Sequence, residues 1–142
     1  MVNSKLTVGI HILALLALAG EMPLTSEQIA GSVNTNPVVI RRLFGLLRAA
    51  GYVESNSGPG GGWRLKIPAD AIALSDLRGA VDQERALFPL HNGQPNPRCP
   101  VGGNIQAVIG GIYSNVVQAM DRQLGLTTIA DVLGTIQTRI KG

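Results

Sequence analysis

The sequence is poor in cysteine, in aromatic residues and in charge. Its 142 residues include one cysteine, Cys99, with only 4% aromatic and 15% charged residues. One thiol excludes a disulfide framework and an all-cysteine metal site within one chain, and it favours a cytoplasmic protein in a reducing compartment. The apolar fraction of 45% provides enough material for a core, and the low charge and 18 glycines argue against an extended disordered tail. We therefore expect one domain, or a small domain with an appendage.

Long apolar runs are also scarce, since the most apolar stretch, residues 5–20, is too short to cross a membrane comfortably. A signal peptide is one interpretation, because Lys5 supplies a basic start and residues 17–19 a small-residue end. His11 in the middle and the lack of secretory cysteines favour a helix that is buried on most sides. We expect a second subunit to cover part of this helix and His11 to be a satisfied core or interface residue. No membrane partner is expected.

Positive charge is concentrated in the first half of the chain. Residues 1–66 hold six basic and three acidic residues, whereas residues 67–142 hold six of each. All of the net charge of +3 therefore lies in the first half. This asymmetry is expected if that half binds a polyanion.

Two helices joined by a short turn are predicted next. Thr25 is followed at capping-box spacing by Gln28, which predicts a helix that starts here and ends near Gly31. Asn36 suits an N-cap and Pro37 a first helical position, so a second helix begins there. A helix, a short turn and a helix with a basic outer face form the helix-turn-helix arrangement.

The helix over residues 36–50, which Gly51 ends as its C′ residue, has two faces at about 100° per residue. The expected core face consists of Val39, Ile40, Leu43, Phe44, Leu46, Leu47 and Ala50. The opposite face consists of Val38, Arg41, Arg42, Gly45 and Arg48. Guanidinium groups bind phosphates and guanine edges well. The face fits a DNA recognition helix, but an ordinary solvated surface fits this helix alone about as well, so the neighbouring elements must decide.

A β-hairpin follows this helix. Tyr52 begins one strand, residues 56–62 form a glycine-dense turn, and residues 63–67 alternate apolar with basic side chains. Arg64 and Lys66 then point to one side, where DNA phosphates would lie. A glycine-rich loop can instead hold a nucleotide phosphate, but here no Gly-Lys-Ser/Thr and no helix follow it. The pattern predicts the wing of a winged helix.

The second half predicts a linker and a long helix. Ser75 is the expected cap of a short helix over residues 75–82, and the proline-containing residues 83–103 read as a linker. A long helix over residues 104–124 carries apolar side chains at three- and four-residue steps. Its candidate dimerisation residues are Ile105, Ile109, Ile112, Val116 and Ala119, beside Gly110 and Gly111, which would let a second helix approach.

The expected fold class is mainly α with a small β-hairpin. A winged helix-turn-helix DNA-binding domain is expected over residues 1–82 and a linker or sensor loop over residues 83–103. A dimerisation helix and a C-terminal helix are expected over residues 104–142. The last helix should run from about residue 128, with Asp131 at capping spacing, to near Arg139.

The chain resembles the Rrf-two family of bacterial winged-helix regulators. The matching stretches are the first apolar helix, residues 26–30, residues 43–53, residues 55–65 with the sharpest pattern around Gly60-Gly61-Gly62-Trp63-Arg64-Leu65, and residues 73–77. Residues 36–47 and 97–102 suggest the YwnA-like branch. The resemblance covers most of the chain, since the family also has a long dimerisation helix near its C-terminus. It implies a homodimer that binds a palindromic operator in double-stranded DNA, usually to repress transcription.

The candidate DNA-binding residues lie on the first and second helices of the helix-turn-helix and on the wing. They are Ser26, Gln28, Thr35, Asn36, Pro37, Val38, Arg41, Arg42, Arg48, Gly60, Gly61, Arg64 and Lys66. The start of the recognition helix should contact base edges, and Arg48 and the wing should contact phosphates.

Cys99 and His91 are the candidate sensor residues. Cluster-binding relatives of the family carry three cysteines before the dimerisation helix, so the single Cys99 argues against an iron–sulfur cluster, and no cofactor is expected. Pro100 suits a first helical position, which puts Cys99 near an N-cap, where the helix terminus and Arg98 would lower its pKa. Three hypotheses stay open: an oxidant or electrophile switch, a cap without a signalling role, and a small-effector pocket near His91.

The function expected is a sequence-specific, homodimeric DNA-binding repressor rather than an enzyme. Cys99 and His91 could form a thiol–imidazole pair, but the sequence shows no third orienting group and no oxyanion motif. The alternative is a winged helix that serves protein–protein contact without specific DNA binding. A steep fall of DNA affinity with salt would separate the repressor from that alternative.

Overall fold

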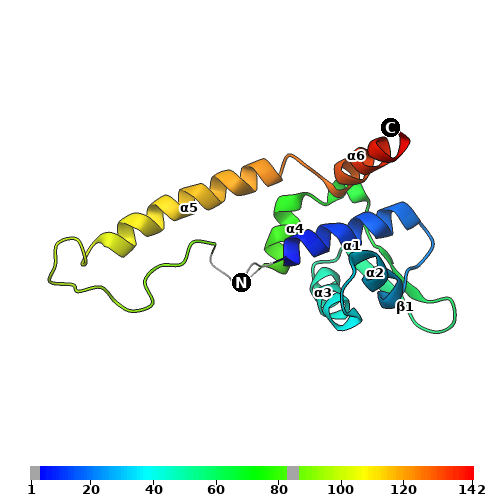
Figure 1. Ribbon diagram of the computed structural model, residues 1–142, viewed down its shortest axis with the longest axis horizontal. Coiled ribbons are helices and arrows are strands. Elements are labelled where there is room, and N and C mark those ends of the chain that lie inside the picture. The colour runs from blue at the N-terminus through cyan, green and yellow to red at the C-terminus, as the bar shows by residue number, and fades with distance from the viewer. Residues whose placement is uncertain (1–3, 83–86) are drawn as a thin grey trace.

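The computed structural model describes residues 4–82 and 87–142, and within them the fold is mainly helical with one two-stranded hairpin, as expected. Its elements in chain order are α1 (Lys5–Ala19), α2 (Ser26–Val33), α3 (Pro37–Ala49), β1 (Val53–Asn56), β2 (Gly62–Leu65), the 3₁₀ helix η1 (Ala69–Ala71), α4 (Leu74–Val81), α5 (Ile105–Leu124) and α6 (Ile129–Lys141). Figure 1 shows α5 projecting from the rest of the molecule. We call α5 with residues 87–104 the arm, and residues 4–82 with residues 126–142 the head.

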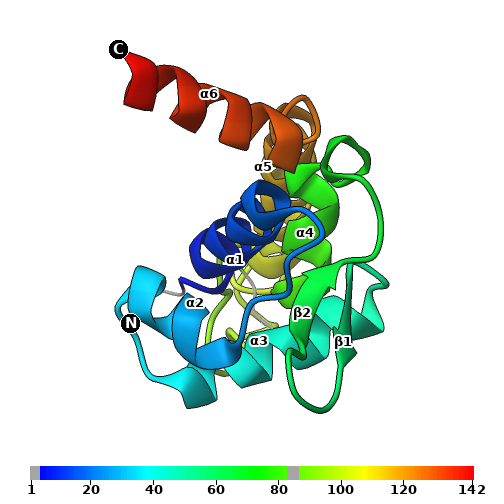
Figure 2. The same cartoon turned by 90° about the vertical axis from the view of Figure 1, so that its right-hand side faces the viewer.

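Helix α1 lies at the centre of the head, which explains why it is apolar nearly all round. It contacts α2, α3, α4, α6 and β2 (Figure 2). Ile12, Leu13 and Leu16 are fully buried. His11 shares a hydrogen bond of 2.9 Å between its Nε2 atom and the hydroxyl of Ser32. The interpretation of His11 as a satisfied histidine is therefore confirmed.

Helix α2 begins at the predicted capping box. The Thr25 hydroxyl accepts the Gln28 N–H at 3.1 Å, and the Gln28 Oε1 atom accepts the Thr25 N–H at 2.8 Å. The expected end near Gly31 is wrong, because the helix continues to Val33. Asn34 ends it instead, in the left-handed conformation with a φ of 63°.

Both ends of α3 are as the sequence predicts. The Asn36 side chain accepts the Val38 N–H at 2.9 Å, and Pro37 occupies the first helical position. At the other end, Gly51 has a φ of 83°, and its N–H bonds to the carbonyl of Arg48. The next N–H, of Tyr52, bonds to the carbonyl of Leu47, which completes a Schellman motif.

The core face of α3 is narrower than the periodicity predicts. Ile40, Leu43, Phe44 and Leu47 are buried as expected. Val39 is 41% exposed, so its assignment to the core is wrong. Ala50, the C-cap after which the chain leaves the helix, is also exposed, so its assignment to the core is wrong too.

The hairpin is antiparallel, with Val53 paired to Leu65 and Asn56 paired to Gly62. Strand β2 therefore ends at Leu65 rather than at residue 67, because β1 begins at its partner Val53. Leu24, just before α2, exchanges two backbone hydrogen bonds of 2.8 and 3.0 Å with Trp63. This isolated bridge ties the turn end of β2 to the segment that leads into α2.

Helix α6 returns the chain to the head. Its capping box of Thr128 and Asp131 is the predicted one, and the helix continues to Lys141, beyond the expected end near Arg139. Ile129 is fully buried among the core residues of the head, and its N–H bonds to the carbonyl of Ile72.

Helix α4 begins one residue earlier than expected. Ala73 is its N-cap and makes no side-chain capping hydrogen bond, so the prediction of Ser75 as the cap is wrong. The backbone N–H of Leu74 bonds to the carbonyl of Thr127 at 2.9 Å, which sets the start of α4 against the chain entering α6.

The arm has few contacts with the head. Helix α5 contains no buried residue. It is attached by an ion pair between the Asp121 carboxylate and the Arg78 guanidinium of α4, with two N–O distances of 2.7 Å, and by Leu124, which packs against the core. Phe88 stacks on Tyr113 with ring centroids 5.1 Å apart, so the loop after residue 87 follows α5. Residues 83–86 of the predicted linker lie outside the described residues. Within the described ranges, no helix is long and apolar enough to span a membrane.

Candidate nucleic-acid interface

Helix α3 and the hairpin lie on the same side of the head, opposite α6 (Figure 2). Trp63 of β2 stacks on Phe44 of α3, with ring centroids 4.1 Å apart and an interplanar angle of 6°. Such close aromatic stacking adds specific geometry to apolar burial. The wing is therefore held at a defined angle to α3.

Arg48 reinforces this junction between α3 and the wing. Its guanidinium carbon lies 4.6 Å from the centroid of the Trp63 ring, and its Nη2 atom donates a hydrogen bond to the Ser55 hydroxyl of β1. A cation over an aromatic face is attracted by the ring quadrupole. Arg48 thus orients the wing and still leaves a positive charge at the surface, where the residue is exposed.

Arg41 lies where α2 and α3 meet. Its Nη2 atom is 2.8 Å from the Oε1 atom of Glu27, and its side chain stays 55% exposed. A backbone hydrogen bond and the hydrogen bond from Arg41 lower the pKa of Glu27 below its usual value. The carboxylate is therefore ionised at neutral pH and partly neutralises the charge of Arg41.

Arg42 and Lys66 carry the positive charges of this surface that have no partner among the described residues. Arg42 is exposed on α3, one position after Arg41, and Lys66 is exposed just beyond β2. By contrast, Arg64 lies 3.7 Å from a Glu21 carboxylate oxygen and 3.6 Å from one of Glu54. Of the two cations predicted for one side of the wing, Arg64 is therefore partly neutralised by carboxylates and Lys66 is not.

The residues at the start of α3 are accessible. Asn36 and Val38 are exposed, and Thr35 and Pro37 are partly exposed. The Oδ1 atom of Asn36 is used in capping, so its amide N–H₂ group is what it can offer a partner. Polar and apolar groups therefore share this edge of the head.

Two predicted contacts on α2 differ in accessibility. Gln28 is exposed, with its Oε1 atom committed to the capping box. Ser26 is only 8% exposed and offers little surface to any partner.

The tip of the wing requires glycine for reasons of its own. A Cβ atom at Gly61 would lie 2.3 Å from the carbonyl oxygen of Asn56, so no side chain fits there. Gly60 is exposed and has a φ of 76°. The turn geometry explains these glycines without a nucleic acid, and the absence of side chains also lets a bulky partner approach the backbone.

Sequence reasoning missed Glu27 and Trp63 as parts of this surface. Glu27 matters because it neutralises Arg41, 14 positions away, and only the turn between α2 and α3 brings the two together. One feature of the sequence could have indicated Trp63: its place in an alternating strand pattern, next to a basic residue. Its stacking on Phe44 depends on the angle of the hairpin.

The candidate sensor residue Cys99 is exposed, at the start of a single turn that precedes α5. The N–H of Gly103 bonds to the Cys99 carbonyl at 2.8 Å. Backbone N–H groups of Gly102 and Val101 donate to the sulfur and lower the pKa of Cys99. The expected N-cap geometry exists in this turn, but α5 begins at Ile105, so Pro100 is not its first residue.

Arg98 and His91 are the two other residues that could act on Cys99. The expected effect of Arg98 is wrong, because the backbone donors and not Arg98 lower the pKa of Cys99. His91 is exposed, and within residues 87–142 it has no hydrogen bond or ion pair to Cys99. The structure does not bring the two candidate sensor residues together as a thiol–imidazole pair.

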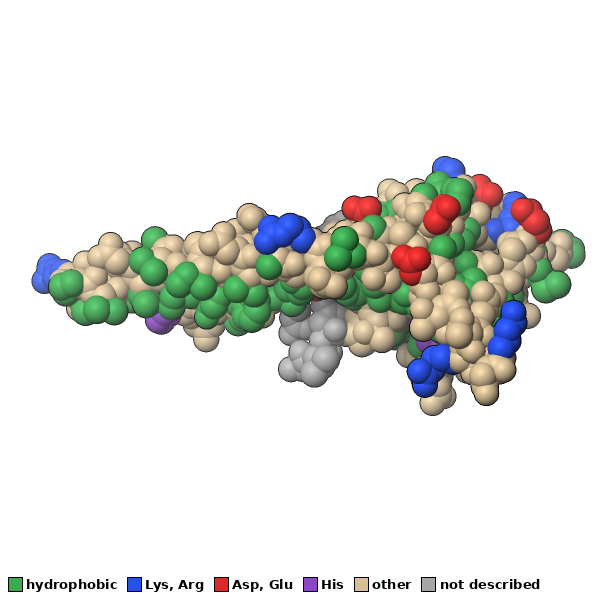
Figure 3. Space-filling view, turned by 90° about the horizontal axis from the view of Figure 1, so that it is seen from above, with side chains coloured by type: hydrophobic (Ala, Val, Ile, Leu, Met, Phe, Trp, Pro, Cys, Tyr) green, Lys and Arg blue, Asp and Glu red, His purple; other side chains and the backbone are tan. Residues whose placement is uncertain are grey.

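The candidate dimerisation residues form a band along α5. Ile112 is 54% and Val116 is 44% exposed, Ala119 is exposed, and Ile105 and Ile109 are half-buried. Figure 3 shows hydrophobic side chains along one side of the arm over most of its length. An apolar band of this kind marks an interaction surface in a soluble protein.

Comparison with known proteins identifies relatives over nearly the whole chain. The sequence profile of the Rrf2 family, described as an iron-dependent transcriptional regulator, matches residues 2–135. YwnA of Bacillus subtilis (strain 168), named provisionally as an HTH-type transcriptional regulator, is 42% identical over 133 residues, or 94% of this chain and 97% of that protein.

Two solved structures share the fold. One, named provisionally as a DNA-binding protein, is 37% identical, with a TM-score of 0.72 over 92% of this chain and 99% of that chain. A second, named provisionally as a transcriptional regulator from Lactobacillus plantarum, is 21% identical, with a TM-score of 0.79 over 94% of this chain and 90% of that chain.

The iron in the family description does not fit the side chains of this chain. The sequence has one cysteine and two histidines. Within the described ranges, no three His, Cys, Asp or Glu residues come together in a group that could hold a metal ion. Iron–sulfur clusters are held by several thiolates, which one chain cannot supply here. With a winged helix-turn-helix head and a match over residues 2–135, the chain belongs to the Rrf2 family of transcriptional regulators, which are DNA-binding proteins and not enzymes.

Proposed function

We propose that the protein is a homodimeric repressor that binds a palindromic operator through α3 and the wing. The observation that carries this proposal is the surface around Arg42, whose guanidinium has no partner among residues 4–82 and 87–142 and lies beside the accessible start of α3. Arg pairs with guanine edges in the major groove through two hydrogen bonds. The arrangement fits a recognition helix whose first turns enter that groove.

Base readout is assigned to the start of α3, and phosphate contacts to its end and the wing. Thr35, Asn36 and Val38 would face base edges together with Arg41 and Arg42. Arg48, Lys66 and the exposed backbone around Gly60 would face phosphates, with Arg64 in a weaker role because two carboxylates flank it. Ser26 is left out because it is buried.

The arm would join two heads into the dimer. The described part of the chain buries no residue of α5, and association would remove the exposed area of the apolar band from water. Two recognition helices related by a two-fold axis would then meet half-sites about one helical turn, roughly 34–36 Å, apart.

The test is binding to a duplex selected by the protein from a random pool, measured by fluorescence anisotropy beside a scrambled duplex. We expect Arg42→Ala to weaken operator binding by about 1–3 kcal/mol and binding to the scrambled duplex by less. Arg139→Ala removes the same charge from α6, on the other side of the head, and should change neither. Equal losses on both duplexes would make Arg42 a phosphate contact only.

The salt dependence of the same titrations tests the alternative of a protein-contact module. A repressor that neutralises several phosphates loses affinity steeply as salt rises, because it releases counterions. We expect a steep, linear fall of log affinity with log salt and a large preference for the selected duplex. A weak, salt-insensitive interaction with no preferred duplex would favour the protein-contact module.

We further propose that oxidation of Cys99 modulates DNA binding. The thiol is exposed, and its lowered pKa raises the thiolate fraction, which reacts with peroxide to a sulfenic acid and hydroxide. The turn that carries it leads directly into α5. The test is operator binding before peroxide, after peroxide and after dithiothreitol, with Cys99→Ser as the control. Identical responses of the wild type and Cys99→Ser would remove the switch and leave a small effector as the modulator.

A further inference from the structure

Two amide side chains of the proposed DNA interface use their oxygen atoms within the chain. The Oδ1 atom of Asn36 accepts the Val38 N–H at 2.9 Å, and the Oε1 atom of Gln28 accepts the Thr25 N–H at 2.8 Å. Asn36 and Gln28 are both exposed. Each oxygen therefore faces the backbone of its own helix, and the N–H₂ group is the part of the amide that is left for a partner.

Glu27, next to Gln28 in the chain, supplies a third acceptor, and its carboxylate is also occupied. One oxygen lies 2.8 Å from the Arg41 guanidinium, and the carboxylate also accepts a backbone N–H. The guanidinium groups of Arg41 and Arg42 have only donors, whereas the partly exposed hydroxyl of Thr35 can donate or accept. The side chains at the start of α3 therefore present mainly donors to a partner.

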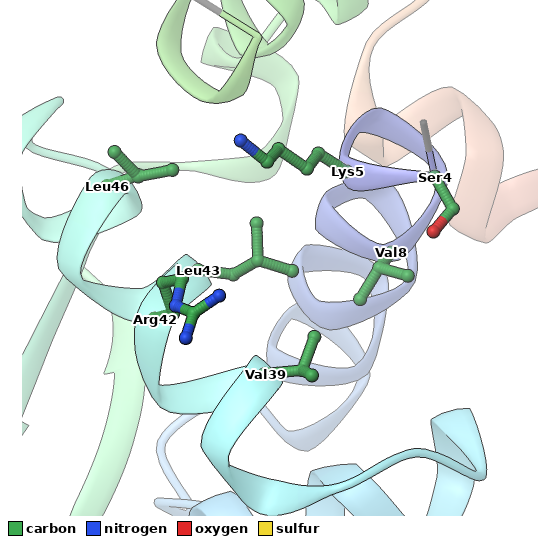
Figure 4. Close-up of a pocket in the computed structure, with 7 residues that line it drawn as sticks. All are labelled: Ser4, Lys5, Val8, Val39, Arg42, Leu43 and Leu46. Carbon is green, nitrogen blue, oxygen red and sulfur yellow. The ribbon is translucent and has the colours of Figure 1, made fainter. Parts of the chain in front are cut away.

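The outward side of α3 adds one apolar side chain. Figure 4 shows Val39 and Leu43 pointing from α3 toward α1, which marks the side of this helix that faces the head. Val38 is 52% exposed, and Arg42, four positions later, is exposed as well. Residues four apart lie on the same face of a helix, one turn from each other. The methyl groups of Val38 and the Arg42 guanidinium therefore share the outward face that a DNA groove would meet.

The major groove presents acceptors on both purines and on thymine, but amino donors only on adenine and cytosine. Guanine offers the N7 and O6 acceptors side by side, and thymine offers O4 next to a methyl group. An Asn or Gln side chain reads adenine with both of its amide atoms, the nitrogen donating to N7 and the oxygen accepting from the 6-amino group. Asn36 could do this only if its oxygen left the cap of α3. The start of α3 thus complements guanine and thymine edges better than the adenine amino group.

We infer that the protein reads its operator half-site by donating hydrogen bonds to guanine and to other acceptors and by packing on a thymine methyl, without accepting a hydrogen bond from an adenine amino group. Arg42 donates to N7 and O6 of one guanine, Asn36 donates to a further acceptor, and Val38 packs on the methyl group. The inference rests on the proposed function, because it assigns the base chemistry of the operator that α3 binds.

The adenine amino group is tested by replacing each adenine of the selected duplex with 2-aminopurine or with 2,6-diaminopurine. Both analogues pair with thymine and both carry an amino group in the minor groove, so they differ at the 6-amino group alone. Fluorescence anisotropy should give affinities within about twofold of each other at every adenine, because no protein oxygen accepts from that group. A loss of about fivefold or more that is specific to 2-aminopurine, at one adenine of each half-site, would overturn the inference.

Two further analogues test the contacts of Arg42 and Val38. 7-Deazaguanine lacks the N7 acceptor and should weaken wild-type binding about tenfold at one guanine of each half-site. Deoxyuridine lacks the thymine methyl and should weaken binding about fourfold at one thymine of each half-site, which is the contribution of one buried methyl group. The first loss should disappear in Arg42→Ala and the second in Val38→Ala. Losses of equal size in the wild type and in the variant would overturn the assignment of that contact.

Asn36→Asp separates the donor of this residue from its cap. Asp caps a helix as well as Asn does, so thermal unfolding should stay as cooperative as in the wild type, but the N–H₂ donor is replaced by an acceptor. Asn34→Asp is the matched control, because it introduces the same charge in the turn before α3, at a left-handed position that Asp tolerates. We expect operator affinity to fall at least about tenfold further in Asn36→Asp than in Asn34→Asp. Equal losses in the two variants would overturn the role of Asn36 as a donor.

The selection of the duplex separates this inference from the proposed function. A protein that enriches no duplex from the random pool contradicts the repressor proposal, and this inference falls with it. A selected duplex whose binding depends on the 6-amino group of adenine contradicts this inference and leaves the repressor proposal intact.

Discussion

The head buries many of its apolar side chains, whereas the arm leaves those of α5 exposed or only half-buried. Every fully buried side chain in the described residues belongs to the head, where α1 is wrapped by helices and by β2. The arm contains a helix of 20 residues with no buried position. A chain that buries its own core folds alone, whereas an uncovered apolar helix needs a partner. This difference supports the proposal that a second copy of the chain covers the arm.

The largest effect on this comparison is expected from a substitution in the core of the head. Phe44 is fully buried and stacks on Trp63, so Phe44→Ala leaves a cavity and loses the ring contact that positions the wing. We expect the free energy of unfolding to fall by about 3–5 kcal/mol, measured by urea denaturation. Val38→Ala, at an exposed position of the same helix, should cost less than about 0.5 kcal/mol. Equal losses for the two variants would contradict the core assignment.

The next largest effect is expected from a charge placed in the apolar band of the arm. Ile112→Asp would bury an unpaired carboxylate in the proposed interface, because Ile112 lies in the middle of the apolar band. We expect the dimer dissociation constant to rise at least about 100-fold, or about 3 kcal/mol, in sedimentation velocity. The free energy of unfolding of the head should stay unchanged.

Ser114→Asp is the matched control for the arm, because Ser114 lies about 180° from Ile112 around α5 and is exposed. It should leave the dimer intact. A wild-type protein that sediments as a monomer at all concentrations, or an unaffected Ile112→Asp dimer, would contradict the proposed role of the band.

A smaller effect is expected where α2 meets α3. Glu27→Gln removes a negative charge from the proposed DNA surface and releases Arg41 from its 2.8 Å ion pair. We expect operator affinity to rise at most about fivefold, since exposed ion pairs are weak. The double variant with Arg41→Ala completes a mutant cycle. A loss of affinity in Glu27→Gln would instead mean that Glu27 positions Arg41 for its DNA contact.

The smallest effect concerns the attachment of arm to head. The hydrogen bonds from Arg78 lower the pKa of Asp121 below its ordinary value of 3.8. This pair therefore stabilises the folded protein above about pH 4, and the contribution is lost as pH falls through the lower folded-state pKa. We expect Asp121→Asn to cost about 1 kcal/mol at pH 7 and progressively less below pH 4, measured by thermal unfolding. A pH-independent difference between the two proteins would contradict this role.

Local signals predict the head better than they predict the surface it presents. Both capping boxes, the Asn36 cap and the Gly51 terminus follow from residue types at fixed spacings, and the structure has all of them. The exposure of Val39 and the Arg41–Glu27 pair depend on how helices distant in sequence meet. Spacing within one helix cannot reveal these contacts.

The same limit applies to the arm. The periodicity of α5 predicts an apolar band, and in the part of the chain that the structure describes no residue of α5 is buried. The return of α6 to the head, with Ile129 in the core, could not be foreseen, because it depends on the turn after α5 and the backbone pairing of Ile129 with Ile72. Domain limits drawn from sequence at residues 82 and 103 stay a prediction.

The most direct test of the account is the number of protomers on one operator. Sedimentation velocity with a labelled duplex would compare the full selected site with a half-site of equal length, for the wild type and for Ile112→Asp. The account predicts two protomers on the full site, with half-site affinity at least about tenfold weaker and the same for both proteins, because each head contacts one half-site. A single protomer that binds full site and half-site equally well would contradict it.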